Sequence, residues 1–238
     1  MKKINIKEKL SEIGVSMDDI ILGDFDYIGR YTAERHRSPD QELYKKVGCF
    51  FRSNFERGIL IYHLIKKYRL TSMLEIGFGR GYSTFCAAKA FQDIGVNGKI
   101  VTIDPKFDFQ LLNQIKNGNV FPSSWFDSIK FAQGTSREIL PTLQNEKFDF
   151  VYIDGDHSYE GTKFDWDHTK NLFNNFLLFD DYHEKSKNDP GIQCQKLIDE
   201  IEDESKELII MDRRIFFDDR RLTDEEINYG QVLLTRSA

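Results

Sequence analysis

The sequence predicts an α/β fold, in which a doubly wound and mostly parallel sheet carries helices on both faces. Short apolar segments alternate with segments of helical periodicity between residues 54 and 181. Several of the apolar segments end in an acidic residue, and the first is followed by a turn containing Gly77, Gly79 and Gly81. A strand, glycine turn and helix in this order often form a nucleotide site, because residues without a Cβ let backbone N–H groups approach a ligand closely.

The predicted elements alternate along the chain. Residues 54–68 carry apolar side chains at helical spacing, and 72–76 form the first strand. The helix after the glycine turn covers 82–91, and the second strand covers 99–104. Further strands are expected at 129–133, 148–154, 175–181, 206–211 and 231–235. Further helices are expected at 135–143, 158–173 and 190–202, with a shorter one from Thr223. These seven strands imply right-handed βαβ units whose ligands bind outside the carboxyl ends of the strands.

Residues 1–53 are the least regular part of the chain, and we expect them to form a helical N-terminal extension ahead of a main domain at 54–238. The extension includes a basic loop whose side chains would meet a polar substrate if it acts as a lid: Arg30, Tyr31, Arg35, His36 and Arg37. Charged loops are usually just solvated, so a cap on the domain or on a second subunit of a homo-oligomer is favoured.

Composition and charge favour a small-molecule partner. The 238 residues are 40% hydrophobic, and the formal net charge of -6 argues against nucleic acid, whose phosphates need a basic face. Cys49, Cys86 and Cys194 lack the spacing of a zinc site or a disulfide framework. No signal peptide or membrane span is apparent, so we expect a cytoplasmic protein with no membrane partner.

Acidic residues end four of the predicted strands: Glu75, Asp104, Asp154 and the pair Asp180 and Asp181. Because the carboxyl ends of parallel strands meet at one edge of a sheet, these carboxylates are expected to converge. Carboxylates gathered in one cleft repel one another, so they require protonation, a hydrogen-bonded ligand or a cation.

The glycine turn and the next strand end predict a nucleoside cofactor. Asp104 has two oxygens that can accept from both ribose hydroxyls, which suits NAD and S-adenosylmethionine equally. Glu75, just before Gly77, favours S-adenosylmethionine (SAM), because a carboxylate there attracts a cationic amino group and would repel a pyrophosphate.

These motifs resemble those of the class I SAM-dependent methyltransferases. Glu75-x-Gly77-x-Gly79-x-Gly81 is similar to their first motif, and Asp104 to their ribose-binding acid. Within that class, the chain resembles the catechol-type and the metal-dependent macrolide-sugar O-methyltransferases over about residues 54–183. The resemblance implies a Rossmann-like sheet with an antiparallel last strand. It also implies this set of cofactor-binding residues: Glu75, Gly77, Phe78, Gly79, Gly81, Tyr82, Ser83, Asp104, Thr135, Ser136, Arg137 and Asp154.

The same resemblance gives roles to the later acids. Asp154, Asp180 and Asp181 match the metal ligands of those enzymes, and three carboxylates suit a hard cation such as Mg²⁺. His157 matches the general base of the sugar enzymes, and the ordinary pKa of histidine suits that task. His183 is the alternative candidate for the base. A second alternative is that His157 only forms hydrogen bonds with the backbone at the start of a helix.

The expected function is therefore methyl transfer from SAM to a hydroxyl of a small molecule, a sugar or a natural product, with Mg²⁺ or another divalent cation in the site. Three alternatives stay open: metal-independent methylation, an NAD-binding oxidoreductase and a non-catalytic SAM-binding protein. No motif identifies the acceptor, whose pocket is expected to involve the extension and residues 107–127 and 185–221.

Overall fold

The computed structural model describes residues 1–32, 55–183, 193–212, 214–217 and 229–236. Several expectations fall outside these ranges, namely the loop residues Arg35, His36 and Arg37, the opening of the helix at 190 and the helix from Thr223. None of the helices in the described ranges is both long enough and apolar enough to cross a membrane.

One eight-stranded sheet runs through the described part of the chain, in the order β1-β7-β8-β6-β5-β2-β3-β4. Neighbouring strands pair in parallel except at β8, which is antiparallel to β6 and β7. The strands are β1 (Lys2–Asn5), β2 (Ser72–Ile76), β3 (Lys99–Asp104), β4 (Ile129–Gln133), β5 (Phe148–Ile153), β6 (Phe173–His183), β7 (Glu207–Ile210) and β8 (Tyr229–Thr235). The mostly parallel sheet with an antiparallel last strand is thus confirmed.

The sheet has one strand more than the seven predicted, because the N-terminal extension supplies β1. This strand pairs in parallel with β7 and forms an outer edge of the sheet. Ile4 is its one buried residue, so the segment lacks the alternating apolar pattern by which a strand is recognised in a sequence. Part of the extension is therefore built into the same sheet as the main domain, and the boundary at residue 54 stays a prediction.

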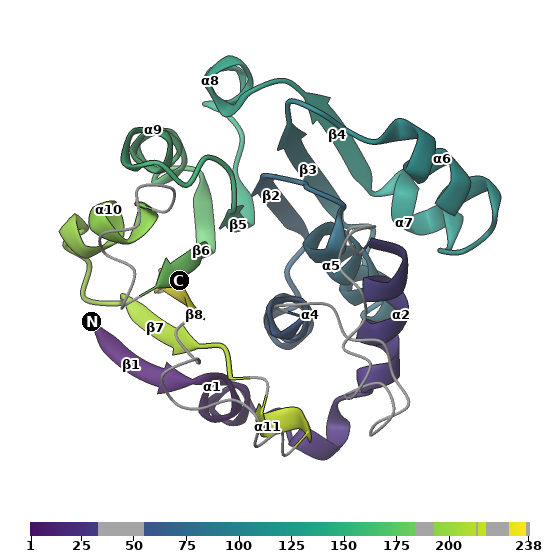
Figure 1. Ribbon diagram of the computed structural model, residues 1–238, viewed down its shortest axis with the longest axis horizontal. Helices are drawn as coiled ribbons and strands as arrows, with labels where there is room; N and C mark the ends of the chain where they lie inside the picture. Colours follow the sequence, from purple (N-terminus) through teal and green to yellow (C-terminus); the bar gives the residue numbers. More distant parts are fainter. Residues whose placement is uncertain (33–54, 184–192, 213, 218–228, 237–238) are drawn as a thin grey trace.

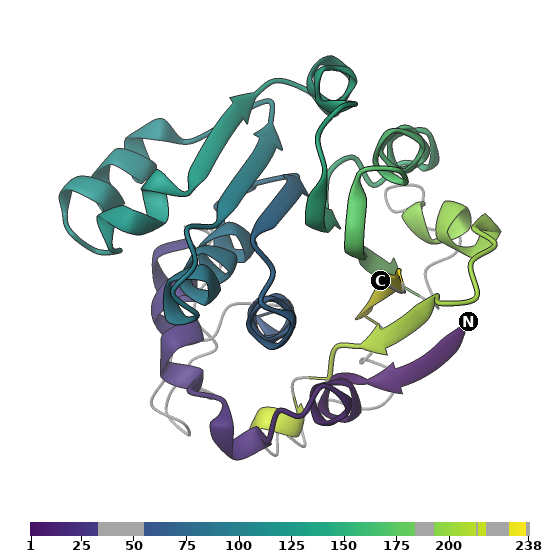
Figure 2. The same cartoon turned by 180° about the vertical axis from the view of Figure 1, so that it is seen from behind.

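Helices cover both faces of the sheet, as a doubly wound fold requires (Figures 1 and 2). Figure 1 shows α1, α2, α4 and α5 along one face and α8, α9 and α10 along the other. Side chains alternate along β2, so Met73 enters the core on the α4 and α5 face and Leu74 the core on the opposite face. The α-helices are α1 (Ile6–Glu12), α2 (Leu22–Thr32), α4 (Glu56–Tyr68), α5 (Tyr82–Asp93), α6 (Phe109–Asn117), α7 (Ser123–Asp127), α8 (Ser136–Ile139), α9 (Tyr159–Thr169), α10 (Cys194–Glu200) and α11 (Arg214–Phe217). The short 3-10 helices are η1 (Met17–Asp19) and η2 (Leu140–Leu143).

Some segments differ from the expected elements. The helix predicted to reach residue 173 ends at Thr169, because Leu172 and Phe173 turn into the core and Phe173 opens β6. The N-terminal extension agrees with its prediction as helical, since its described residues contain α1, η1 and α2. Residues 107–127, unassigned from the sequence, contain α6 and α7, which Figure 1 shows beside β4.

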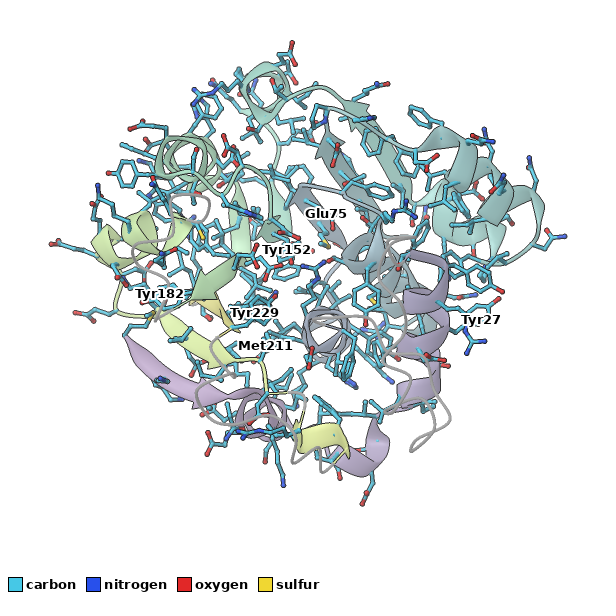
Figure 3. The ribbon with its side chains drawn as sticks, in the orientation of Figure 1. Tyr27, Glu75, Tyr152, Tyr182, Met211 and Tyr229 are labelled. Atoms are coloured by element: carbon cyan, nitrogen blue, oxygen red, sulfur yellow. The ribbon has the colours of Figure 1, made fainter. Side chains whose placement is uncertain are left out.

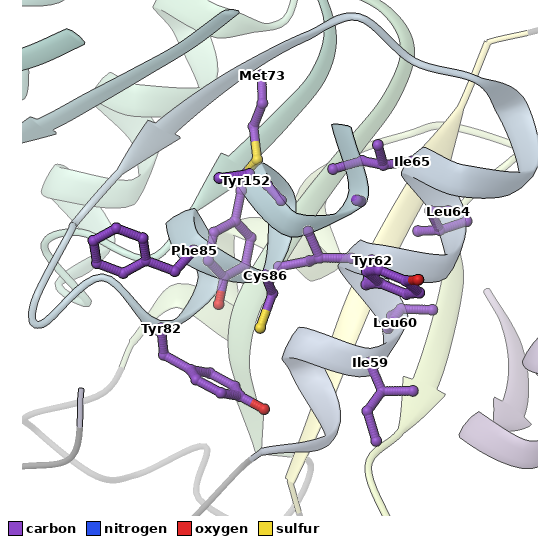
Figure 4. Packing of buried hydrophobic residues seen from close by; sticks show 14 of the residues in the cluster. Ile59, Leu60, Tyr62, Leu64, Ile65, Met73, Tyr82, Phe85, Cys86 and Tyr152 are labelled. Atoms are coloured by element: carbon purple, nitrogen blue, oxygen red, sulfur yellow. The ribbon is translucent and has the colours of Figure 1, made fainter. Parts of the chain in front are cut away.

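Helix α4 is buried almost all round and packs against α5 (Figure 4). The two helices approach closely at Gly58, where an added Cβ would lie 2.6 Å from the Cys86 Sγ and 2.7 Å from the Tyr82 ring. Because packed interiors leave little room for adjustment, this contact fixes the first turn of α4. That turn carries Arg57, whose side chain reaches the carboxyl ends of β5 and β6.

Candidate active site

The turn between β2 and α5 depends on the backbone freedom of glycine. Gly77, Gly79 and Gly81 have φ angles of 91°, 55° and 84°, in the left-handed region that other residues rarely adopt. An added Cβ at Gly77 would lie 1.9 Å from the carbonyl oxygen of Asp154. Glycine at this position is therefore what lets the end of β2 lie against the end of β5.

Asp104, at the end of β3, holds the glycine turn in place. One of its oxygens accepts from the backbone N–H groups of Phe78 and Gly79, each at 3.1 Å. The other oxygen accepts from the backbone N–H of Lys106 at 2.8 Å. A carboxylate has about four lone-pair positions, so Asp104 keeps acceptor capacity for a ribose hydroxyl.

A cavity of about 470 Å³ lies beside the turn, at the carboxyl edge of the sheet where ligands of this fold class bind. Its size is typical of small-molecule sites. Among the lining residues are seven that the sequence predicted to bind the cofactor: Gly77, Gly79, Asp104, Thr135, Ser136, Arg137 and Asp154.

The other predicted cofactor residues do not line this cavity: Glu75, Phe78, Gly81, Tyr82 and Ser83. The ring of Phe78 packs against Phe107, and the Tyr82 hydroxyl donates to the backbone oxygen of Phe55 at 2.7 Å. These side chains support the turn from behind, and their contacts with a cofactor stay predictions.

Glu75 is a buried carboxylate whose hydrogen-bond donors, among the described residues, are both neutral. One oxygen accepts from the hydroxyls of Thr84 and Thr102, the latter at 2.6 Å. The other oxygen is buried and has no hydrogen-bond partner in the described part of the chain. Burial raises the pKa of Glu75 to about 7, and the two threonine hydroxyls offset this only in part.

His157, in the loop that follows β5, lies between two carboxylates. Its Nε2 is 3.4 Å from Asp154 Oδ1 and 3.2 Å from Asp181 Oδ2. The hydrogen bond to Asp154 is the main reason that the pKa of His157 rises to about 9. Asp181 has a φ of 53° and coincides with a register irregularity in β6. This local kink places its carboxylate beside the histidine. The rival base, His183, ends β6, and its side chain lies outside the described residues.

Asp180 is fully enclosed by protein donors. Its Oδ2 accepts from Arg57 and from the Tyr152 hydroxyl, both at 2.5 Å. Its Oδ1 accepts from the Tyr229 hydroxyl and from Gln231 Nε2, the latter at 3.1 Å. Burial alone would raise the pKa of Asp180, but the guanidinium and the hydroxyl donors outweigh it and hold the pKa below its ordinary value. Figure 3 shows Tyr152 and Tyr229 in the interior of the molecule.

Arg57 is the functional residue that the sequence reasoning missed. Its Nη1 contacts Asp180 Oδ2 and lies 3.2 Å from Asp154 Oδ2, so one guanidinium bridges two strand ends. The available signal was an arginine two residues before the apolar run Ile59 to Tyr62 of the predicted helix, together with Gln231 in an apolar strand. Neither residue shows from the sequence which carboxylate it meets.

The structure groups the predicted metal ligands differently from the prediction. Asp180 does not fit an ion shared with Asp154 and Asp181, because four protein groups already donate to its two oxygens. Among the described residues, the group whose ligand atoms converge is Asp154, His157 and Asp181, with these atoms within 4.8 Å of one another. An imidazole in place of the third carboxylate makes this set less suited to Mg²⁺ and more suited to a borderline cation.

Comparisons with known proteins agree with this arrangement. Residues 74–182 match the sequence profile of a methyltransferase domain family. The O-methyltransferase TomG from Streptomyces achromogenes, involved in tomaymycin synthesis and solved with SAM, is similar in fold at a TM-score of 0.55 and 16% identity, over 98% of this chain and 96% of that one. No curated protein matches the chain.

Two further solved structures share the fold. An O-methyltransferase from Bacillus cereus with bound S-adenosylhomocysteine (SAH) has a TM-score of 0.54 and 16% identity, over 97% of each chain. The SAH-bound methyltransferase PaMTH1 from Podospora anserina has a TM-score of 0.54 and 18% identity, over 89% of this chain and 88% of that one. The resemblance read from the sequence thus agrees with both comparisons: residues 74–182 match a methyltransferase domain, and the chain shares the fold of methyltransferases solved with SAM or SAH.

Proposed function

We propose that the protein transfers a methyl group from SAM to a hydroxyl of a small molecule. The carrying observation is that the cavity formed by the glycine turn and Asp104 extends to Asp154, which contacts His157. A cofactor bound in the cavity would therefore end beside a side chain able to accept a proton.

The cofactor would lie along the cavity in one direction. Asp104 would accept from the ribose hydroxyls, and the segment Thr135 to Arg137 would hold the adenine. Glu75 would accept from the amino group through its unpartnered oxygen, which supplies that oxygen with the donor it lacks. Ser83 would bind the carboxylate, as the resemblance implies.

In the transfer, the bond from the methyl carbon to the sulfonium sulfur breaks as the acceptor oxygen forms its bond to the same carbon. The acceptor proton passes to Nε2 of neutral His157, a form that becomes more populated as the pH rises toward its pKa of about 9, and SAH is released. Asp154 and Asp181 then stabilise the imidazolium, since both carboxylates lie within 3.4 Å of that nitrogen. Much of the rate comes from holding the reacting atoms in line.

A metal-dependent form of this function is the second candidate. The observation that favours it is the convergence of Asp154, His157 and Asp181. A divalent cation held by these residues would supply positive charge that acidifies the acceptor hydroxyl. His157 would then be a ligand and could not also serve as the base.

The acceptor class is part of the proposal. A sugar or another natural product is supported by the similarity in fold to TomG, an enzyme involved in tomaymycin synthesis. A homo-oligomer formed through the N-terminal extension and a cytoplasmic location also stay proposals. Light scattering of the intact protein over a range of concentrations would test the first.

The experiment that tests the function is a methyl-transfer assay. Labelled SAM is incubated with a panel of nucleotide sugars, glycosides and catechols, and SAH formation is followed for each. His157→Gln is expected to lower kcat by about 100-fold to 10,000-fold while leaving SAM affinity unchanged. The proposal would be contradicted if the wild-type protein bound SAM but methylated no hydroxyl. A protein that bound NADH and not SAM would favour an oxidoreductase.

A further inference from the structure

The acidic edge of the sheet already contains a cation supplied by the chain. Arg57 Nη1 contacts Asp180 Oδ2 at 2.5 Å and Asp154 Oδ2 at 3.2 Å. The Arg57 side chain is 14% exposed, that of Asp154 16% and that of Asp180 0%, so solvent screens this arrangement weakly. Two carboxylates in contact with one group would repel each other, and the guanidinium between them offsets that repulsion.

We infer that Arg57 takes the place of a divalent cation in this site, so that methyl transfer proceeds without a bound metal. The inference rests on the proposed function and specifies which positive charge the methyl-transfer site uses. Asp180 has a fully buried side chain, and both of its oxygens already accept hydrogen bonds. The donors are Arg57, Tyr152, Tyr229 and Gln231. A metal ion could reach it only by displacing these donors, and each one left unpaired in the interior would cost free energy.

Asp154, the second of the expected metal ligands, also accepts hydrogen bonds from the protein. Its Oδ2 accepts from Arg57 at 3.2 Å and from the Tyr152 hydroxyl at 3.3 Å. A divalent ion on Asp154 would share that carboxylate with the guanidinium, and two cations on one carboxylate repel each other. The protein donors therefore disfavour a metal at both residues.

Arg57 also orients the residues that would do the chemistry. Because Oδ2 of Asp154 is held by Arg57 and Tyr152, its Oδ1 is the oxygen that faces His157 Nε2 at 3.4 Å. Arg57 thus acts as a positioning residue for His157. Its own position is fixed by the close packing of α4 against α5 at the next residue, Gly58.

Two measurements on the wild-type protein test the inference directly. Mn²⁺ is titrated into the protein and bound ion is followed by electron paramagnetic resonance, with and without SAM. Methyl transfer is then measured in excess EDTA and in added Mg²⁺ or Mn²⁺. We expect no stoichiometric Mn²⁺ binding and a rate in EDTA within about twofold of the untreated rate, because Arg57 already supplies the charge. One tightly bound Mn²⁺ together with loss of activity in EDTA would overturn the inference.

Variants at Arg57 provide a second test of the inference. Arg57→Met is expected to lower kcat by about 100-fold, and Arg57→Lys by about tenfold because an ammonium keeps the charge but not the bridging geometry. SAM affinity should change less than about threefold in both, since Arg57 does not line the cofactor cavity. Loss of the guanidinium should let the Met variant, but not the Lys variant, bind Mn²⁺ at Asp154, beside His157 and Asp181. A Met variant with wild-type kcat would refute the role of Arg57.

Lys99→Met is the matched control, because it removes a positive charge from an exposed ion pair with Glu146. It should leave kcat and Mn²⁺ binding unchanged. If Arg57→Met does not fold, the wild-type EDTA and Mn²⁺ measurements still decide the question.

Failure of the proposed function has a different signature, namely SAM binding without methyl transfer to any acceptor. In that case the Mn²⁺ titration alone decides whether Arg57 is the cation of the site.

Discussion

Glu75 and Asp180 are both buried acids near the carboxyl ends of central strands, yet their environments have opposite effects on their charge. Glu75 meets two threonine hydroxyls and keeps one oxygen without a partner, and its pKa rises to about 7. Asp180 meets a guanidinium, two tyrosine hydroxyls and an amide, and its pKa is held below the ordinary value.

The difference distinguishes a carboxylate that awaits a ligand from one that the protein has already satisfied. An unpartnered buried oxygen is costly, so at Glu75 a donor from outside has much to contribute. At Asp180 an outside cation would have to displace existing donors. The proposed contact of Glu75 with a cationic ligand group would supply a missing donor, whereas an outside cation at the end of β6 would displace donors already present.

The largest expected effect is on stability at Asp180. Asp180→Asn should lower the free energy of unfolding by about 3–5 kcal/mol, because it removes the negative charge from a buried ion pair and turns an amide toward protein donors. Urea unfolding of the variant measures this. Asp181→Asn is the matched control: its side chain is 18% exposed against 0% for Asp180, and asparagine tolerates the left-handed backbone, so it should cost clearly less than Asp180→Asn. Equal costs would show that Asp180 is not the satisfied residue described above.

The second largest effect is expected at Gly77, on the cofactor side, where substitution should lower the free energy of unfolding by more than about 2 kcal/mol. Gly77→Ala combines a φ of 91° with a Cβ that would overlap the Asp154 carbonyl oxygen. Calorimetric titration with SAM should show reduced affinity in addition to the lower stability. Gly95→Ala, with a φ of 67° and no atom within 4 Å of the added Cβ, separates backbone strain from overlap and should retain SAM affinity.

Glu75→Gln sharpens the comparison through SAM affinity. Loss of the carboxylate should weaken SAM binding by about 10-fold to 100-fold, corresponding to the 1.5–3 kcal/mol typical of a hydrogen bond to a charged group. Glu146→Gln, at an exposed ion pair, should leave the affinity unchanged. Equal SAM affinity in wild type and Glu75→Gln would remove the proposed contact with the amino group.

The same variant has a pH signature. The pKa of Glu75 is raised in the folded protein from 4.5 to about 7, so its proton binds more tightly in the folded state. Its contribution to stability is therefore fully present below pH 4.5 and is lost as the pH rises through about 7. Urea unfolding between about pH 5 and 8 should show this decline in wild type and a weaker one in Glu75→Gln.

The smallest effect is expected at Thr135, which precedes α8 and lines the cavity. Its backbone N–H donates to Glu138 at 2.8 Å and its hydroxyl donates to the same carboxylate at 2.9 Å. Thr135→Ala should cost about 1 kcal/mol, as the loss of a helix cap does, and weaken SAM binding only a few-fold. Ser158→Ala, at the cap of α9 outside the cavity lining, should match the stability loss and leave SAM affinity unchanged. A larger loss of affinity at Thr135 would mean a direct contact with the cofactor.

The cofactor side could be predicted from the sequence because its parts are local. The glycines, the capping box at Thr135 and the acid ending β3 each lie within a few residues of the element they serve. The environment of Asp180 could not be predicted, because its donors come from far along the chain. Arg57 is 123 residues away and Gln231 is 51. The position of Asp180 at a strand end could be predicted, but its contacts disfavour the metal-ligand role expected for it.

The place of β8 has a consequence for how the protein is made. This strand is the last in chain order but lies inside the sheet, between β6 and β7. During synthesis, β6 and β7 emerge first and have no common neighbour until residues 229–235 follow. The same strand brings Tyr229 and Gln231 to Asp180, so a nascent chain that has not reached it leaves that carboxylate without two of its donors. Completion of the sheet and completion of the donor set around Asp180 thus both depend on β8, and pairing between segments distant in sequence is intrinsically slow.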